Sequence, residues 1–490
     1  MFKSITLFVI SLLVAPGLGL FASIHGMDVL HAESGAASLN EIWARCAAWG
    51  ANAPEGCAML ERLRLLNRIS WIALAVTVAL PLFYLVAAWI LGRNRDLLAR
   101  LFPWLVRLVL GILPLVLVAH GILVWFGSWE MVEMGFIPAN LKLMLVLGGL
   151  GLMLVISAIS ILASIKRMLE PDSLHVTGIL LEKQEMPQLF ARVSRLAAKL
   201  GSREPERIIV GIEPTAYVAN VPIKLRGVGD LPEAETLYLP TPALRVLSDA
   251  ELDALIGHEL GHFRGADVEF STRFSPSLRN LAIAAEAVAT EDSEEEGSMS
   301  LALLPAIGLL GFMLYTIRRI VGRISRQREF AADQASLEVS SPQAIATLLV
   351  KFNALSLQWQ GFRHGLVALL HRGVSRQNLS VDYLARTRQF LSAAPADKLR
   401  NFLIEAHTPH PLDSHPPLIE RAKAVGMDAG SVINSSLASL YDVRVPPAGL
   451  EAIEERISQI DADYYRHPTS PVAISNDPEL PPELSFSQPT

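Results

Sequence analysis

The chain has 490 residues, of which 51% are hydrophobic and 18% are charged. This composition excludes a purely water-soluble protein and predicts membrane spans, with room for two or three units of ordinary domain size. The net charge of −6 is mild and no long basic run occurs, so we expect no nucleic-acid partner.

Four apolar segments in the first third of the chain predict transmembrane helices, because each is about as long as a bilayer is thick. They are residues 4–23, 69–92, 105–126 and 143–165. The first segment has no small-residue cleavage motif after it, so we interpret it as a retained anchor rather than a signal peptide. We therefore assign residues 1–168 to a membrane domain with about four transmembrane helices.

The distribution of Lys and Arg between these segments predicts their orientation. Arg93, Arg95 and Arg100 follow the second segment, and Lys166 and Arg167 follow the fourth. Both chain ends and everything after residue 166 are therefore expected on the cytoplasmic side of a bacterial inner (plasma) membrane. Three arginines ahead of the second segment oppose this orientation, namely Arg62, Arg64 and Arg68.

Only two cysteines occur, Cys46 and Cys57, and their spacing does not suit a metal. They would form a disulfide if their loop faced an oxidising compartment, or would remain free thiols otherwise. Any metal site in this chain must therefore use histidine and carboxylate ligands.

The pattern becomes globular after residue 170, with a predicted helix over residues 186–201 that ends at a glycine. Short strands are then predicted at residues 207–212, 216–223 and 235–240. The middle strand has a proline at position 214 and another at position 222, which suits the edge of a sheet. A small sheet beside helices predicts an α+β domain that is mainly helical.

The stretch "GHELGH", residues 257–262, lies on a predicted helix that starts at a capping box of Ser248 and Glu251. His258 and His262 are four residues apart, so both imidazoles lie on one face and can reach the same zinc ion. Glu259 is displaced around the helix, where its carboxylate can reach a water beside the metal. This is the pattern of a metalloprotease. The alternative is a buried helix whose histidines only form hydrogen bonds.

A catalytic zinc needs a third protein ligand and an open fourth position. Glu329 and Asp333 are also four residues apart on a predicted helix. Glu329 can bind zinc, and Asp333 can accept the outer N–H of a ligating histidine and fix its tautomer. The alternative is an ordinary charged helix face.

Three motifs, "GHELGH" (257–262), "REFAADQ" (328–334) and "SHPPLIER" (414–421), give the chain its resemblance to a known family. It resembles the M48 zinc metallopeptidases, which include HtpX-like and Ste24-like integral membrane gluzincins. The resemblance covers roughly residues 170–425 and implies a zincin-type (gluzincin) catalytic domain joined to multi-pass membrane helices. It also implies one Zn²⁺ per chain.

The resemblance implies a role for each matching residue. His258, His262 and Glu329 would bind the zinc, Glu259 would activate water, and Asp333 would support a ligand. His415 and Arg421 would stabilise the oxyanion or position the substrate carbonyl, with His407 and His410 as alternatives to His415 or as plain loop histidines.

Many members of the family carry an Asn-Ala-Phe-like stretch on the edge strand that pairs with substrate. Thr215 stands here where the asparagine would fall. Main-chain pairing does not need that side chain, so we still expect an extended substrate beside this strand. The residues expected to contact it are Tyr217, Val218, Ala219, Asn220 and Val221.

An apolar segment, residues 299–317, lies between the two predicted zinc helices. Glu329 must meet His258 on the same side of the membrane, so the intervening chain must cross an even number of times. We favour a helix docked at the membrane or against the other spans. The alternative is a hairpin crossing with residues 276–291, whose Arg279 and Glu286 would be costly in lipid.

These observations divide the chain into the membrane domain, a metallopeptidase domain over residues 169–465 that includes the apolar helix near 299–317, and a Pro- and Ser-rich tail over 466–490 that is expected to be disordered. The predicted function is a membrane-bound zinc endopeptidase that cleaves membrane or membrane-associated proteins in quality control. The alternatives are a Ste24-like processing protease for lipidated or dedicated peptide substrates, and a non-catalytic membrane scaffold with a vestigial zinc site.

Overall fold

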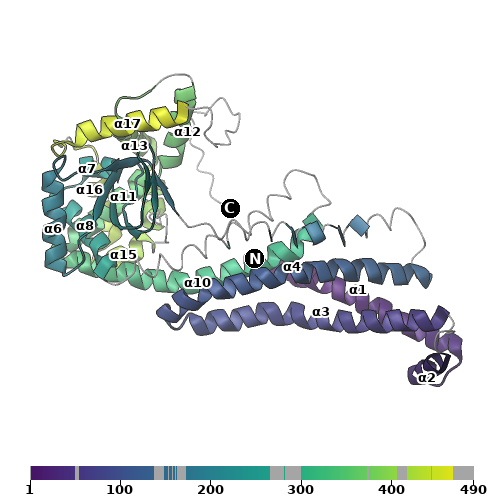
Figure 1. Ribbon diagram of the computed structural model, residues 1–490. Coiled ribbons are helices and arrows are strands. Elements are labelled where there is room, and N and C mark those ends of the chain that lie inside the picture. The colour runs from purple at the N-terminus through teal and green to yellow at the C-terminus, as the bar shows by residue number, and fades with distance from the viewer. Residues whose placement is uncertain are drawn as a thin grey trace. The chain divides into compact units, whose positions relative to one another are not determined.

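The computed structural model describes residues 2–49, 55–136, 173–264, 300–371, 375–405, 416–442 and 444–466, with residue 281 and single positions or short pieces between 148 and 162 (Figure 1). The chain divides into two compact units. Unit 1 comprises residues 1–171 and 273–321, and unit 2 comprises residues 172–272 and 322–490. The described elements are mostly helices with two small sheets, so the predicted fold class is confirmed.

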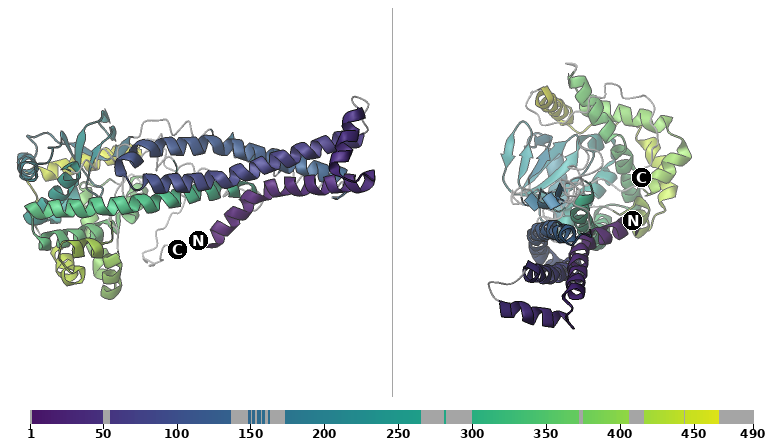
Figure 2. Two further views of the ribbon diagram at one scale, coloured as in Figure 1. Left: turned by 90° about the horizontal axis from the view of Figure 1, so that it is seen from below. Right: turned by 90° about the vertical axis from the view of Figure 1, so that its right-hand side faces the viewer.

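Unit 1 is built from long helices that run side by side over most of their length (Figure 2). They are α1 (Phe2–Ser34), α3 (Glu55–Leu91) and α4 (Arg95–Glu133), with the short α2 (Leu39–Trp49) between the first two. Three stretches of the described chain are long and apolar enough to cross a membrane: Leu13–Ser34, Glu55–Leu91 and Arg100–Glu133. They overlap the first three predicted segments, of which the first starts earlier and ends earlier than Leu13–Ser34, whereas most of the fourth, residues 143–165, lies outside the described residues.

Buried polar pairs connect these apolar helices. The Asn67 amide donates to Ser23 Oγ at 3.0 Å between α3 and α1, and Thr77 Oγ1 lies 2.9 Å from His120 Nε2 between α3 and α4. Such pairs fix the register of packed membrane helices, because an unpaired polar group in hydrocarbon is costly.

One end of this helix bundle is held by covalent and ionic links. Cys46 and Cys57 form a disulfide that joins α2 to the first turn of α3. One turn further along α3, Arg62 donates to Glu130 at 2.7 Å and also to Glu133, both in the last turns of α4. One of the three arginines that oppose the predicted orientation is therefore paired with acidic residues at its own end of the bundle.

The apolar segment between the predicted zinc helices forms the first half of α10 (Ser300–Val339) from residue 300 onward. Tyr84 of α3 donates its hydroxyl to the carbonyl of Met313 at 3.0 Å, and Ile320 packs against Gly92. These contacts support the docked-helix prediction. The hairpin alternative involves residues 276–291, which lie outside the described residues except for Leu281.

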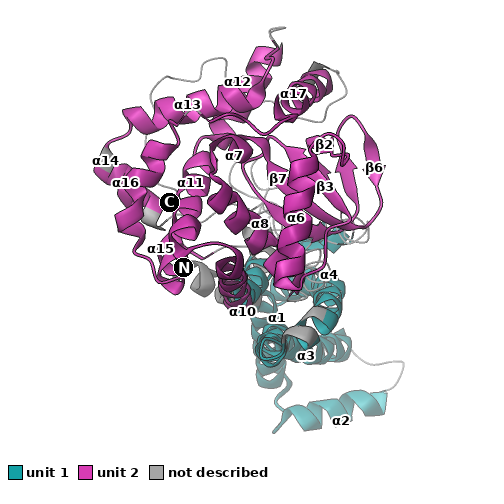
Figure 3. Cartoon of the chain, turned by 90° about the vertical axis from the view of Figure 1, so that its left-hand side faces the viewer, with its two compact units in different colours: residues 1–171, 273–321 teal, residues 172–272, 322–490 magenta. Residues whose placement is uncertain are grey.

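Unit 2 contains two sheets (Figure 3). The larger has the order β2 (Gly178–Leu180), β3 (Arg207–Gly211), β7 (Glu235–Pro240), β4 (Tyr217–Asn220), and the smaller has the order β1 (Leu174–Val176), β5 (Ile223–Leu225), β6 (Gly229–Leu231). β3 and β7 are parallel and β4 pairs antiparallel with β7 at the edge, with Tyr217 opposite Tyr238. The predicted edge position is therefore correct, although the predicted strand 216–223 divides into β4 and β5.

Successive side chains of the larger sheet alternate between two apolar layers, as the period of a strand requires. Ile208 and Val210 enter the main core, which the helices cover, whereas Ile209 enters a second layer that includes residues of the smaller sheet. The α6 helix ends where predicted, since Gly201 adopts a φ of 60° at its C-cap. The helices of unit 2 outside α10 are α6 (Pro187–Leu200), α7 (Thr241–Val246), α8 (Asp249–Arg264), α11 (Pro342–Ser356), α12 (Trp359–His371), α13 (Leu379–Ala393), α14 (Ala396–Glu405), α15 (Leu418–Ala424), α16 (Ala429–Ser439) and α17 (Leu450–Arg466). Beyond α17 the predicted tail lies outside the described residues.

Candidate metal centre

The α8 helix begins at the capping box that the sequence predicts. The Ser248 amide donates to Glu251 Oε2 at 2.7 Å, and the Glu251 amide donates to Ser248 Oγ at 3.3 Å. The Glu251 carboxylate also accepts from the buried ammonium of Lys351 on α11 at 2.8 Å, and Lys351 donates to the Val246 carbonyl at 3.2 Å. The first turn of α8 is therefore fixed by a reciprocal cap and a buried ion pair.

His258 and His262 lie on the buried face of α8, and their rings are 4.9 Å apart and perpendicular. Glu329 of α10 faces both rings. Its Oε2 lies 3.5 Å from His258 Nε2, and its Oε1 lies 3.5 Å from His262 Nε2. One ligand atom from each of the three residues lies within 4.8 Å of the others. Two imidazoles and a carboxylate at this spacing are the ligand set of a catalytic zinc site.

Two glycines of α8 let α10 approach closely enough for Glu329 to reach the histidines. A Cβ atom added at Gly261 would lie 3.0 Å from both Ala332 Cα and Ala335 Cβ of α10. A Cβ added at Gly257 would collide with the side chain of Val339. The spacing of the two ligand-bearing helices is thus set by the absence of side chains at these positions.

Asp333 and Arg421 form a charged layer behind the three residues. Asp333 Oδ1 lies 2.9 Å from His258 Nδ1, which directs the other ring nitrogen of His258 toward Glu329. Arg421 of α15 makes a two-point contact with Asp333, at 2.9 Å through Nε and 2.6 Å through one terminal nitrogen. Its other terminal nitrogen lies 3.5 Å from Glu329. Arg421 is only 4% exposed, so its contacts are with the ligand residues and not with solvent.

The protonation of His258 reflects this charged surrounding. Burial and the nearby Arg421 lower the pKa of His258, but its hydrogen bonds to Asp333 and Glu329 outweigh them and raise that pKa to about 10. The Arg421 guanidinium in turn outweighs burial and keeps the pKa of Asp333 below its usual range. A metal ion binding at His258 must therefore displace a proton.

Glu259 provides a test of whether the residues suit a hydrolytic metal. Its side chain is 3% exposed, and its Oε2 atom has no hydrogen-bond partner among the described residues. A buried carboxylate oxygen without a partner is costly, so it calls for a water or a ligand beside it. Together with two imidazoles and Glu329 facing one point, this unpaired oxygen fits a zinc ion with a neighbouring water.

The predicted substrate strand is β4, and it lies next to α8. Tyr217, Val218, Ala219 and Val221 are buried and Asn220 is partly exposed. Tyr217 stacks on Tyr238 at a centroid distance of 4.9 Å, so its ring belongs to the layer between the sheets. These side chains belong to the fold. What β4 offers to a substrate is therefore its main chain at the end of the larger sheet, not its side chains.

The structure brings together His258, Glu259, His262, Glu329, Asp333 and Arg421, as the sequence predicts. His415, together with His407 and His410, lies outside the described residues. Lys351 and the two glycines were not predicted. The spacing Gly257-x-x-x-Gly261 would have signalled the close helix approach, whereas no local pattern pairs Lys351 with a residue 100 positions away.

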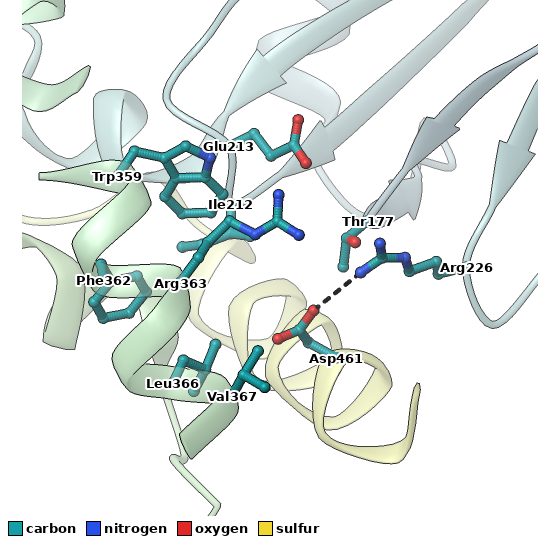
Figure 4. Close-up of a pocket in the computed structure, with 10 residues that line it drawn as sticks. All are labelled: Thr177, Ile212, Glu213, Arg226, Trp359, Phe362, Arg363, Leu366, Val367 and Asp461. Atoms are coloured by element: carbon teal, nitrogen blue, oxygen red, sulfur yellow. Dashed lines mark ion pairs between the residues drawn. The ribbon is translucent and has the colours of Figure 1, made fainter. Parts of the chain in front are cut away.

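A second polar cluster surrounds a small cavity elsewhere in unit 2 (Figure 4). Asp461 of α17 forms an ion pair with Arg226 at 3.6 Å, and the guanidinium of Arg363 points into the space between Arg226 and Glu213. Burial raises the pKa of Asp461 to about 6 and also raises that of Glu213. The cavity offers about 10 Å³, enough for one water molecule, so it does not suit a substrate.

The sequence is similar to a known family of peptidases and to several known proteins. The model of peptidase family M48 matches residues 183–427, which is half of the chain and contains every residue of the candidate metal centre. A "Protease HtpX homolog" of Methanocaldococcus jannaschii is 33% identical over 178 residues, which are 35% of this chain and 60% of the relative. Relatives of the same name from Thermococcus kodakarensis and Pyrococcus furiosus are 29% and 24% identical, over 41% and 54% of this chain and 70% and 89% of their own lengths. No solved structure matches the chain.

Proposed function

The chain belongs to peptidase family M48, and on that premise we propose that it is a membrane-bound zinc-dependent endopeptidase. The observation that carries the proposal is the convergence of His258, His262 and Glu329 on one point, with an unpaired oxygen of Glu259 buried on the same helix. A structural zinc site would be closed by a fourth protein ligand, whereas three ligands leave a position for water and substrate.

The roles of the residues follow from their contacts. His258, His262 and Glu329 would hold one Zn²⁺, which when bound supplies Lewis acidity and lowers the pKa of water to about 7. Glu259 would take a proton from the attacking water and deliver it to the leaving amine. Asp333 would hold His258 in the tautomer whose Nε2 is free to ligate, and Arg421 would hold Asp333 and balance the acidic charge of the site.

The substrate would bind as an extended strand along β4, because main-chain pairing with an edge strand needs no specific side chain. The buried position of Arg421 supports a role through Asp333 and Glu329 more than a direct contact with substrate. His415 is therefore our candidate for the group that stabilises the oxyanion.

The substrates would be membrane or membrane-associated proteins, since relatives are named proteases and three described helices are long enough to cross a bilayer. Quality control is the role that we propose for this cleavage. We place the protein in a bacterial inner membrane with residues 169–465 in the cytoplasm. The Cys46–Cys57 disulfide supports this topology, because a disulfide belongs in an oxidising compartment. If residues 143–165 form a fourth crossing, the disulfide and the metal centre lie on opposite sides of the membrane.

Two other functions remain distinguishable by experiment. A Ste24-like processing enzyme would cleave only dedicated lipidated or peptide substrates. Cells that carry an inactive variant would then accumulate only a few proteins relative to cells that carry the wild type. A scaffold with a vestigial site would bind metal without cleaving anything. The unpaired oxygen of Glu259 favours hydrolysis over the scaffold.

The decisive experiment measures zinc content and casein cleavage for the purified chain and its Glu259→Gln variant. We expect wild-type cleavage to stop on addition of a chelator. The variant should retain zinc and lose about 10³-fold in rate, because it loses the proton-transfer group and no ligand. Glu338→Gln is the matched control, since Glu338 is exposed on α10 and pairs with Arg264 away from the ligands. Full activity of Glu259→Gln would refute the mechanism.

A further inference from the structure

The α6 and α8 helices of unit 2 pack side by side and run in the same direction (Figure 3). Arg195 of α6 donates to Asp253 of α8 at 3.2 Å, and Ser202, just after α6, reaches Leu260 of α8. Both pairs are 58 residues apart in the sequence, so the two helices advance together. Since α6 ends at Leu200, the residues that follow it lie beside the last turn of α8.

Two residues after α6 bind main-chain carbonyl groups at the end of α8. Ser202 Oγ donates to the carbonyl of Leu260 at 2.7 Å, and a terminal nitrogen of Arg203 donates to the carbonyl of Phe263 at 3.5 Å. The guanidinium carbon of Arg203 also lies 5.7 Å from the ring centroid of Phe263. We refer to Ser202 and Arg203 as the α8 clamp.

The α8 clamp is itself held by neighbouring contacts. Gly201 ends α6 in the left-handed conformation, and the Ser202 amide donates back to the Ala197 carbonyl at 3.0 Å, which fixes the main chain of the clamp. Arg203 forms an ion pair with Glu235 at the start of β7. The Arg203 side chain is 46% exposed, so this ion pair adds little stability, but it orients the guanidinium toward α8.

The turn that the clamp contacts carries His262. Helix α8 ends two residues after His262, and in the last turn of a helix the carbonyl groups lack partners within the helix and the chain opens most easily. The two clamped carbonyls, of Leu260 and Phe263, lie on either side of His262 in the sequence. His258 lies one turn further into the helix and is fixed by Asp333. The position of His262 therefore depends on how firmly the last turn is closed.

We propose that Ser202 and Arg203 are positioning residues for the metal centre, which keep the last turn of α8 closed and so hold His262 within reach of the ion. A hydroxyl and a guanidinium suit this task, because both donate to carbonyl oxygens and a positive charge is favourable at the C-terminal end of a helix. The inference rests on the proposed function in so far as His262 binds zinc. The closing of the turn does not depend on that function and can be measured without metal.

The first measurement is hydrogen exchange of the metal-free, full-length chain in detergent, followed in the peptide that contains residues 257–264. The Ser202→Ala, Arg203→Ala double variant should exchange the amides of the last turn about tenfold faster than the wild type, which is the size of effect expected for loss of a helix cap. Ser202→Ala alone removes one hydroxyl and should give about threefold, so it keeps the test decisive if the double variant fails to fold. Exchange at the wild-type rate in these variants would overturn the clamp, whether or not the chain is a peptidase.

The second measurement is zinc affinity, from competition with a chromophoric chelator. The double variant should bind zinc about tenfold more weakly, because groups that orient a ligand typically contribute 10-fold to 100-fold to metal affinity. Faster exchange with unchanged zinc affinity would overturn the link between the clamp and His262. A wild type that binds zinc and cleaves no protein would refute the proposed function and leave the clamp intact.

Two further variants serve as controls. Arg195→Ala removes another arginine that joins α6 to α8, but its partner Asp253 lies nearer the start of α8. It should leave the exchange of the last turn and the zinc affinity at their wild-type values. An effect as large as that of the double variant would show that any weakened contact between the two helices suffices, and would overturn the specific role of the clamp. Arg203→Lys keeps the positive charge and should exchange more slowly than Arg203→Ala, whereas equal rates would overturn the role of Arg203.

Discussion

Replacing Gly261 by alanine tests whether the separation of α8 and α10 controls metal binding. The added Cβ would lie 3.0 Å from Ala332 Cα and from Ala335 Cβ, whereas ordinary carbon contacts are about 3.6 Å or more. One of these atoms belongs to the backbone of a helix, which cannot give way by changing a rotamer. The two helices must therefore separate by a few tenths of an ångström, which is as large as or larger than the tolerance of about 0.2 Å in metal–ligand distances.

Two opposing contributions determine how far Gly261→Ala changes the stability of the protein. Overpacking costs about 1–3 kcal/mol, and the better helix propensity of alanine returns about 1 kcal/mol, so the net loss of stability should be at most about 2 kcal/mol. The loss of zinc affinity should be the larger effect, on the order of tenfold or more, because Glu329 moves away from both histidines. Competition with a chromophoric chelator measures the affinity, and thermal unfolding measures the stability.

Gly322→Ala is the matched control, because a Cβ at Gly322 of α10 meets nothing within 4 Å. It should gain up to about 1 kcal/mol in stability from helix propensity and leave zinc affinity unchanged. If Gly261→Ala behaved like Gly322→Ala in both measurements, the reasoning from helix separation would be refuted.

Two further predictions concern buried charges of unit 2. Lys351→Met should destabilise the chain by about 3–5 kcal/mol, because it leaves the Glu251 carboxylate buried without its cation. The double variant with Glu251→Gln should recover part of that loss. Equal stability of the single and double variants in urea unfolding would contradict the ion pair. Burial raises the pKa of Asp461 to about 6, above its unfolded value of 3.8, so the folded chain is favoured at low pH and loses this contribution as pH rises from about 4 to 7. The free energy of unfolding of the Asp461→Asn variant should therefore rise by about 3 kcal/mol relative to that of the wild type between pH 4 and pH 7. If the difference in stability between the two proteins in thermal unfolding did not change with pH, this prediction would be wrong.

The predictable parts of the site are those that depend only on the spacing of residues close together in the sequence. The capping box of Ser248 and Glu251 and the i, i+4 pairs His258–His262 and Glu329–Asp333 follow from helical periodicity alone. Prolines on either side of β4 revealed its edge position because proline cannot donate to an inner strand.

The remaining features depend on contacts between distant parts of the chain. Lys351 meets Glu251 only because α11 packs on α8, and Arg421 reaches Asp333 from a helix that starts 85 residues later. The strands β1, β2, β5 and β6 contain three residues each, which is too short for an alternating pattern to be recognised in a sequence.

The layer of Asp333 and Arg421 behind His258 has a consequence for how the protein acquires its ion. In a zinc finger the metal is what folds the chain, and the empty chain is disordered. Here the protonated ring of His258 and the guanidinium of Arg421 already neutralise the acidic groups around them, and both are held by hydrogen bonds. The protein would thus complete its folding before loading, and maturation would be an exchange of a proton for a cation inside a finished scaffold.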